Sequence, residues 1–317
     1  MLRAIAICGL ALSLAHPVVA DTPPRVVTTI GKLADITTRI GGDCVQVQSL
    51  IGAGADPHLY RPSAGDVQTL AQAQAIVFVD PALEARLADV LARLGATRPT
   101  LGVMQAALRP DLIRSANGAP DPHIWMDVAL WAQIIDPIFG LLEQVAPDCT
   151  DQMQGNADVL RAQLATLDMW VRDAITSIPE GRRVLVTAHD AFTYFSAAYG
   201  IEASEAIEGI STESEAAIAD IRAVADFVRE RGVVAVFPET TINPRTIEAL
   251  VREVQAQGGT LTLGASLFSD AMGDPGTAEG TYIGMIRHNV TAIVTALGGT
   301  LPDWPDELAD WAARHGQ

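Results

Sequence analysis

Short apolar runs alternate with helical patterns along this chain, and that alternation constrains the fold more than any other feature. Strands are predicted at residues 25–30, 45–51, 75–79, 184–187, 233–237 and 260–263. Helical periodicity fills many of the intervals, for example 82–94, 215–231 and 244–257. Strands that alternate with helices in this way form parallel sheets, so the sequence predicts an α/β protein with two lobes.

A long helical pattern lies between the two groups of strands, at residues 156–178. Its apolar positions recur at steps of three and four residues and form one stripe: Leu160, Leu164, Leu167, Val171 and Ile175. Pro179 and Gly181 then end the helix. At about 1.5 Å per residue it is roughly 35 Å long. The pattern fits either a stiff strut between two lobes or an amphipathic helix inside one lobe.

The first twenty residues are typical of an export signal. Arg3 gives a short positive start, residues 4–14 are mostly apolar, and small residues end the segment at Ala20. The apolar run is too short to span a bilayer. We expect cleavage after Ala20 and a soluble periplasmic protein; an uncleaved anchor would need a longer apolar core. Cys8 does not suit a lipoprotein site, because Ile7 precedes it where a small residue is expected.

The net charge of the chain is −17. Loss of the leader removes one arginine and no acid, which leaves 20 basic against 38 acidic residues and a charge of −18. Such acidity argues against nucleic acids and anionic membrane surfaces as partners. Cys44 and Cys149 are the cysteines of the expected mature chain. A disulfide and two buried thiols both remain open, because the sequence does not give the distance between them.

Four segments each offer one metal-binding side chain where the pattern predicts a loop. They are Asp56-Pro57-His58-Leu59-Tyr60, Asp121-Pro122-His123-Ile124-Trp125-Met126-Asp127, Val186-Thr187-Ala188-His189-Asp190 and Phe268-Ser269-Asp270-Ala271. Three imidazoles and one carboxylate would suit a divalent transition metal. His189 directly follows a predicted strand, and the carboxyl ends of strands are where open α/β sheets bind ligands. A single histidine, taken alone, is more often a surface or core residue.

Other polar residues have simpler interpretations. His288 lies within the helical pattern 280–297, which favours a structural role. Asp127, four residues after His123, and Glu239 are each able to orient a ligand ring by accepting a hydrogen bond, or to serve as a helix cap or surface acid. Trp125 is expected to pack in the core, as is Phe192.

Longer motifs around these residues carry a family resemblance. They are Gly41-Gly42-Asp43; Ala55-Asp56-Pro57-His58 with Tyr60 and Pro62; Asp121-Pro122-His123-Ile124-Trp125-Met126-Asp127; Thr187-Ala188-His189-Asp190-Ala191-Phe192 with Tyr194-Phe195 and Tyr199-Gly200; Ser269-Asp270-Ala271; and Gly280-Thr281-Tyr282 with Met285 and His288-Asn289. With them the chain resembles the substrate-binding proteins of bacterial ABC importers for zinc and manganese. The resemblance covers essentially the whole mature chain.

This resemblance implies the site and the domains. His58 and His123 would bind the metal from the first lobe, and His189 and Asp270 from the second. One long rigid helix would join the lobes, with a signal peptide at 1–20, an N-terminal lobe at 21–152, the helix at 153–179 and a C-terminal lobe at 180–317. It also implies a monomeric carrier and not an enzyme, which closes modestly on its metal and docks on an ABC permease with a cytoplasmic ATPase.

Features of the sequence point to more than one metal. Three imidazoles with one carboxylate favour zinc, which the Irving–Williams order ranks above manganese. Members of the family that prefer manganese often carry a glutamate where this chain has His189. Members specialised for zinc often have a histidine-rich loop before the second ligand, and residues 111–120 contain no histidine. We expect zinc or manganese, with zinc bound more tightly in vitro, and iron stays open.

Two other functions stay open at this point. A zinc hydrolase keeps one coordination position for water, whereas four protein ligands close the site, and the chain has no His-Glu-x-x-His or Gly-x-Ser-x-Gly motif. A binding protein for an organic solute such as a sugar lacks material for an aromatic platform, since aromatic residues make up 5% of the chain. With imidazole ligands, metal binding is expected to weaken below about pH 6.

Overall fold

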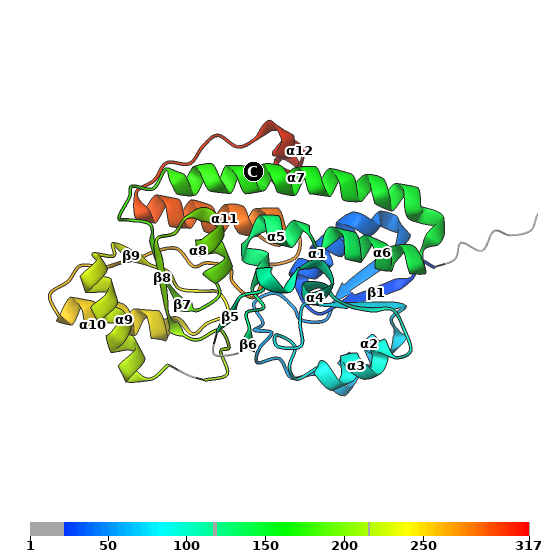
Figure 1. The fold of residues 1–317 in the computed structure, drawn as a ribbon, viewed down its shortest axis with the longest axis horizontal. Helices are drawn as coiled ribbons and strands as arrows, with labels where there is room; N and C mark the ends of the chain where they lie inside the picture. Colours follow the sequence, from blue (N-terminus) through cyan, green and yellow to red (C-terminus); the bar gives the residue numbers. More distant parts are fainter. Residues whose placement is uncertain (1–21, 117–118, 215, 317) are drawn as a thin grey trace, which may run out of the picture.

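The computed structural model describes residues 22–116, 119–214 and 216–316, so the predicted leader and its cleavage site lie outside the described residues. Two α/β lobes lie side by side beneath one long helix (Figure 1). The predicted fold class, two lobes with parallel sheets joined by a long helix, is confirmed.

The sheet of the first lobe has four parallel strands in the order β2-β1-β3-β4. The strands are β1 (Arg25–Thr28), β2 (Gln46–Ser49), β3 (Ala75–Phe78) and β4 (Thr100–Gly102). The helices of this part of the chain are α1 (Gly31–Gly41), η1 (Gly42–Cys44), α2 (Ala64–Gln72), α3 (Ala88–Gly95), α4 (Val103–Ala107), η2 (Pro110–Leu112), η3 (Ile124–Met126), α5 (Val128–Ala132), α6 (Ile135–Val145) and η4 (Pro147–Cys149). A short antiparallel hairpin pairs β5 (Ser115–Ala116) with β6 (Ala119–Pro120).

The predicted helix 82–94 begins late, at Ala88, and the chain before it forms turns. The buried carboxylate of Glu84 explains the difference. It accepts hydrogen bonds from the backbone N–H groups of Val79 and Asp80 at 3.0 Å each and from the Thr29 hydroxyl at 2.6 Å. These bonds satisfy the backbone N–H groups that follow β3, and they hold the chain around Glu84 in turns instead of a helix.

The second lobe repeats this arrangement. Its strands are β7 (Val184–His189), β8 (Ala203–Glu208), β9 (Ala235–Val236) and β10 (Thr262–Leu263). Parallel pairing joins β7 to β8 and β9 to β10, and a parallel bridge from Thr187 to Phe237 connects the pairs in the order β8-β7-β9-β10. β8 was not predicted, because it contains several polar residues and much of the strand is exposed to solvent. Its remaining helices are α8 (Thr193–Tyr199), α9 (Ile218–Arg231), α10 (Pro244–Ala256), α11 (Tyr282–Leu297), η5 (Asp306–Leu308) and α12 (Ala309–His315).

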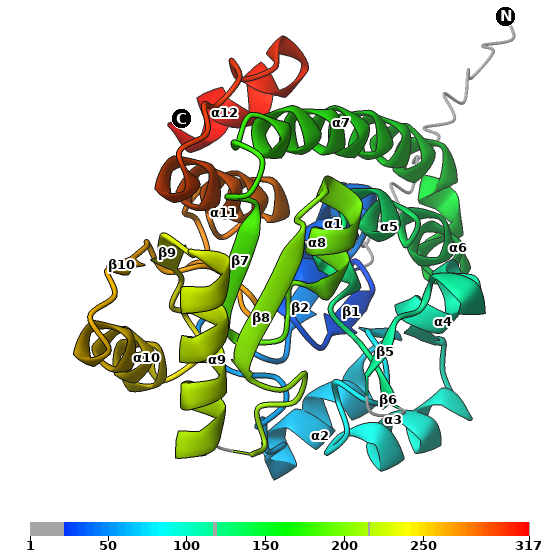
Figure 2. The same ribbon diagram turned by 60° about the vertical axis from the view of Figure 1, so that its left-hand side comes forward.

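The long helix is α7 (Thr150–Thr176), which begins six residues earlier than the predicted pattern because η4 leads directly into it. Its 27 residues span about 40 Å. It packs against α1, α5 and α6 on one side of the molecule and against α8 and α11 on the other (Figures 1 and 2). Its buried stripe therefore joins one hydrophobic core that contains residues of both lobes, as expected of a strut.

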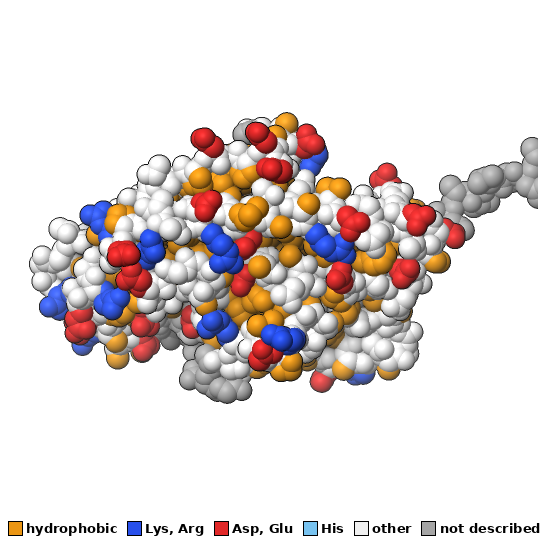
Figure 3. All heavy atoms as spheres, turned by 45° about the horizontal axis from the view of Figure 1, so that its top comes forward, with side chains coloured by type: hydrophobic (Ala, Val, Ile, Leu, Met, Phe, Trp, Pro, Cys, Tyr) orange, Lys and Arg blue, Asp and Glu red, His pale blue; other side chains and the backbone are white. Residues whose placement is uncertain are grey.

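Two remaining features of the fold are an apolar segment and the distribution of surface charge. Residues Val128–Val145 are long and apolar enough to cross a membrane, but they form α5 and α6, whose apolar side chains belong to the hydrophobic core. Figure 3 shows acidic and basic side chains interspersed with apolar ones over the face on which α7 lies. The negative charge of the chain is therefore not concentrated on that face.

Cys44 and Cys149 form a disulfide, with their Cα atoms 6.2 Å apart. It joins η1 to η4 and so ties the end of α1 to the start of α7. The two cysteines are 105 residues apart in sequence, and most of the first lobe lies inside the closed loop. Of the two alternatives that the sequence left open, the structure selects the disulfide.

Loss of this disulfide should lower the free energy of unfolding by about 2–5 kcal/mol, because a cross-link across about 100 residues strongly restricts the unfolded chain. Guanidinium unfolding of the wild type and of a Cys44→Ser/Cys149→Ser variant measures the difference, and single variants separate it from the effect of a free thiol. Identical unfolding midpoints would contradict this role.

Candidate metal centre

Four side chains from distant segments converge between the lobes. His58, His123, His189 and Asp270 each offer one ligand atom, and these atoms all lie within 4.8 Å of one another. The Nε2 atom of His123 lies 3.4 Å from Nε2 of His58 and 3.4 Å from Nε2 of His189. Three imidazoles therefore present the same ring nitrogen to one point. All four residues are buried.

The loop after β2 places His58. The Asp56 carboxylate accepts a hydrogen bond from the His58 backbone N–H at 2.8 Å and fixes the turn that presents the ring. Its second oxygen accepts a hydrogen bond from the hydroxyl of Thr212 at 2.6 Å. Because Thr212 belongs to the second lobe, Asp56 connects this ligand to the opposite side of the site.

Asp121 holds His123 in place. One oxygen of its carboxylate accepts both the backbone N–H of His123, at 3.0 Å, and the ring Nδ1–H, at 2.7 Å. A proton on Nδ1 leaves the lone pair of Nε2 free for a metal. Of the roles that the sequence left open for Asp127, the structure shows the helix cap: its carboxylate accepts from the backbone N–H groups of Ala129 and Leu130 at the start of α5. Asp121 was missed, although its place two residues before His123 in Asp-Pro-His is a local signal.

Glu239 holds His189 in the same way. His189 ends β7, and one Glu239 oxygen accepts its backbone N–H at 2.8 Å while the other lies 2.5 Å from Nδ1. Glu239 itself follows β9, the strand next to β7. Two imidazoles thus have their rings fixed by carboxylates, one local in sequence and one across the sheet. The predicted orienting role of Glu239 fits this geometry.

The surroundings of Asp270 suit a cation. Among the described residues, neither of its buried carboxylate oxygens meets a hydrogen-bond donor with suitable geometry. Oδ1 lies 3.2 Å from Nε2 of His123, and Oδ2 lies 3.3 Å from Nε2 of His189 and 3.7 Å from Nε2 of His58. A buried carboxylate is costly unless positive charge lies beside it, and either protonated imidazoles or a metal cation among these atoms would supply that charge.

Burial and neighbouring charges set the protonation of the rings. Burial alone would lower the pKa of His123, but the carboxylates of Asp121 and Asp270 together raise it to about 9. Burial is likewise outweighed at His189, where Glu239 and Asp270 hold the pKa well above its ordinary value. Burial dominates at His58 and lowers its pKa. The three imidazoles hold the pKa of Asp270 well below its usual range in spite of burial.

The remaining histidines lie elsewhere. The ring of His288 is on α11, where Nε2 donates to the carbonyl of Ser266 at 2.9 Å and the ring lies 4.9 Å from that of Phe268. His315 bonds to the carbonyl of Trp311. His16 lies outside the described residues. Trp125 is buried as expected, but its indole N–H also donates to the carbonyl of Ser269 at 3.0 Å.

Comparison with known proteins places these features in a family. Residues 26–296 match the family described as zinc-uptake complex component A, periplasmic. The chain is 41% identical over 278 residues to the zinc-binding protein TroA of Treponema pallidum, covering 88% of this chain and 90% of that protein. It is 39% identical over 279 residues to the manganese-binding lipoprotein MntA of Bacillus subtilis, covering 88% and 91%.

Solved structures agree with the sequence matches. The periplasmic zinc-binding protein TroA from Treponema pallidum superimposes with a TM-score of 0.84 at 42% identity, over 87% of this chain and 99% of that one. The Fe(III)-bound YtgA from Chlamydia trachomatis superimposes with a TM-score of 0.81 at 29% identity, over 88% and 100%.

Replacement of Asp121 by asparagine should weaken metal binding by about 10–100-fold, because the ring of His123 loses the carboxylate that fixes its tautomer. Chelator-competition titration with zinc measures the change. Asp127→Asn is the matched control, since that side chain caps a helix, and it should leave affinity nearly unchanged. A larger loss in the Asp127 variant would reverse the assignment.

Proposed function

Because the chain belongs to the family of periplasmic zinc-uptake components, we propose that His58, His123, His189 and Asp270 capture a divalent transition metal ion for delivery to an ABC permease. Membership makes the chain a substrate-binding protein and not an enzyme, so the hydrolase alternative is set aside. The observation that carries the choice of ligands is the convergence of the three Nε2 atoms on the buried carboxylate of Asp270.

The donor set supports zinc or manganese as cargo. The three Nε2 nitrogens and one carboxylate are ligands that suit zinc, and relatives are named for zinc and for manganese. Both Asp270 oxygens face the imidazoles, so the carboxylate has the geometry to bind through one oxygen or two. Two-oxygen binding gives five ligands and accommodates manganese, while zinc should still bind more tightly in vitro.

Membership of the family indicates where the protein acts and in which kind of system. The protein acts outside the cytoplasm as the binding component of a metal transporter. Within that setting we propose a monomer that is cleaved after Ala20, with lobes at 21–152 and 180–317 and a joining segment at 153–179, most of which is α7. The long helix and the core that it shares with both lobes support a modest closure on the cargo instead of a wide hinge.

Elemental analysis tests the function and the site together. Stripped protein is offered equal zinc and manganese, and the wild type should retain one ion per chain, mainly zinc. His189→Ala should lose affinity by more than the roughly 10–100-fold that loss of an outer partner costs, because a ligand itself is removed.

His288→Ala is the matched control and should retain the ion, since its ring bonds to a carbonyl on α11. Retention by the His189 variant with loss in the His288 variant would overturn the ligand assignment. A wild type that retains no metal would favour an organic solute as cargo.

Metal binding should release protons and should weaken as the pH falls. The raised pKa values mean that His123 and His189 should each carry a second ring proton at neutral pH in the metal-free protein. A metal ion that binds through Nε2 must displace this proton from each ring. The affinity for the metal should therefore increase with pH up to about pH 9. Below that pH it should decrease, by up to about 100-fold per pH unit where both rings carry the second proton. The window lies above the value of about pH 6 expected for ordinary imidazoles.

Calorimetric titration at neutral pH in buffers with different ionisation enthalpies counts the displaced protons. We expect about two protons per ion. Release of fewer than one, or an affinity that stays constant from about pH 8 to pH 6, would contradict this account of the site.

A further inference from the structure

The loop that carries Asp270 is held by the opposite lobe. It follows β10 of the second lobe, yet two consecutive carbonyl groups bond to side chains of the first lobe. The Trp125 indole N–H donates to the carbonyl of Ser269 at 3.0 Å. The ammonium group of Lys32 donates to the carbonyl of Asp270 at 2.5 Å. Both donors are fully buried.

The far end of the same loop is also held by the first lobe. The carboxylate of Asp35 accepts a hydrogen bond from the backbone N–H of Tyr282, the first residue of α11, at 3.1 Å. The Tyr282 hydroxyl donates to the carbonyl of Trp125 at 2.7 Å. Lys32 and Asp35 are three residues apart on α1 and so lie on one face of that helix. One helix face thus contacts both ends of the loop.

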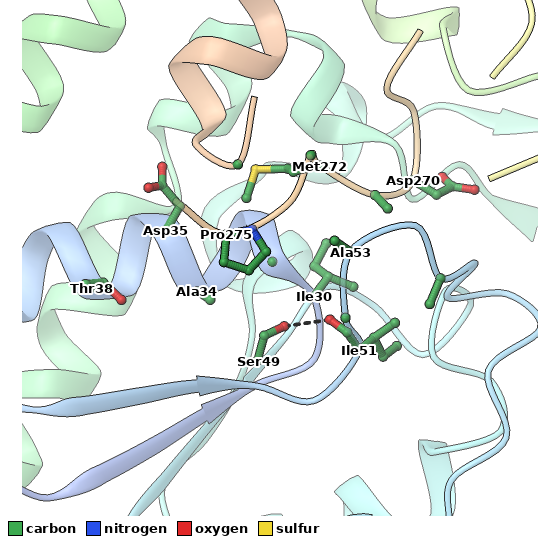
Figure 4. A pocket seen from close by; sticks show the side chains of 16 residues that line it. Ile30, Ala34, Asp35, Thr38, Ser49, Ile51, Ala53, Asp270, Met272 and Pro275 are labelled. Atoms are coloured by element: carbon green, nitrogen blue, oxygen red, sulfur yellow. Dashed lines mark hydrogen bonds between the residues drawn. The ribbon is translucent and has the colours of Figure 1, made fainter. Parts of the chain in front are cut away.

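Between these ends, one side of the loop borders a cavity. The cavity has a volume of about 250 Å³ and lies between the loop, the start of α1 and the turn after β2. Figure 4 shows Met272 and Pro275 of the loop facing it beside Asp35, with the carboxylate of Asp270 at the far end. Because packing on that side is incomplete, the contacts at the two ends have a large share in fixing the loop.

The ammonium of Lys32 needs an explanation of its own. It lies 4.5 Å from the centre of the Trp125 ring, and its hydrogen-bond partner is a carbonyl oxygen instead of a carboxylate. A buried charge is costly, and a methionine of similar length would fill the same space without that cost. A role in packing alone therefore does not account for a lysine here.

We propose that Lys32, Asp35 and Trp125 form a loop clamp that fixes residues 269–282 to the first lobe and thereby positions the Asp270 carboxylate for the cargo. Lys32 is a positioning residue in this scheme, because it bonds to the backbone of Asp270 and does not touch the ion. The clamp makes Asp270 a ligand that is placed by the first lobe, like His58 and His123. The predicted effect on metal binding rests on the proposed function, whereas the predicted effect on the structure of the loop does not.

Hydrogen exchange of the metal-free protein gives the structural readout. Lys32→Met should speed exchange of the loop amides of Gly273, Thr277 and Thr281, which bond within the loop, by about tenfold or more. Thr37→Val is the matched control, since it changes a buried residue on the same helix whose hydroxyl meets no hydrogen-bond partner within the described part of the chain. Loop exchange that is the same in both variants would overturn the clamp.

A double-mutant cycle with Asp270→Asn gives the metal readout. Lys32→Met should weaken zinc binding by about 10–100-fold in the wild-type background and add little in the Asp270→Asn background, because it acts through that carboxylate. The absorption spectrum of bound cobalt should change in Lys32→Met towards that of Asp270→Asn. Equal losses in both backgrounds, or tighter binding by Lys32→Met, would overturn the inference.

Trp125→Phe is the second variant, should Lys32→Met fail to fold. It removes the indole donor to Ser269 and keeps an aromatic ring, and it should show the same dependence on Asp270. A wild type that binds no metal would count against the proposed function, while the exchange experiment would still decide whether the clamp exists.

Discussion

The metal centre depends on one electrostatic constraint, the carboxylate of Asp270 buried among three imidazoles. The imidazoles hold the pKa of Asp270 well below its usual range, and this carboxylate in turn helps to raise the pKa values of His123 and His189, so we expect both rings to carry a second proton in the metal-free protein. A divalent ion that displaces these two protons leaves the total charge of the buried site unchanged. The site can therefore exchange protons for metal without the cost of a new net charge in a region of low dielectric.

The fold supplies the geometry that this exchange needs. The four proposed ligands come from segments that lie far apart in sequence, and each of two rings is held by a carboxylate that accepts both its backbone N–H and its Nδ1–H. The helix α7 and a hydrophobic core shared by both lobes limit how far the loops can separate. Contacts across the site, such as that of Asp56 with Thr212, then join loops that are already close.

Much of this site could be predicted from local sequence, and the rest depends on distant contacts. The four proposed ligands lie in motifs that extend over several residues each. Asp121 was missed although its signal is local, whereas the helix cap that the sequence left open for Asp127 is the role that the structure shows. The disulfide joins residues that are 105 positions apart, and the hydrogen bond of Lys32 to Asp270 joins residues that are 238 positions apart. No short-range pattern encodes such contacts. The late start of α3 depends in part on such a contact, since Glu84 accepts a hydrogen bond from Thr29, 55 positions away, besides those from the nearby Val79 and Asp80.

The same carboxylates that orient the rings also bear on release of the cargo. A carrier has to hold its ion tightly and still surrender it, and ligands with strongly raised pKa values regain protons readily once the ion leaves. Asp121 and Glu239 thus favour both states of the site: they direct Nε2 to the metal when it is bound, and they stabilise the imidazolium when it is not.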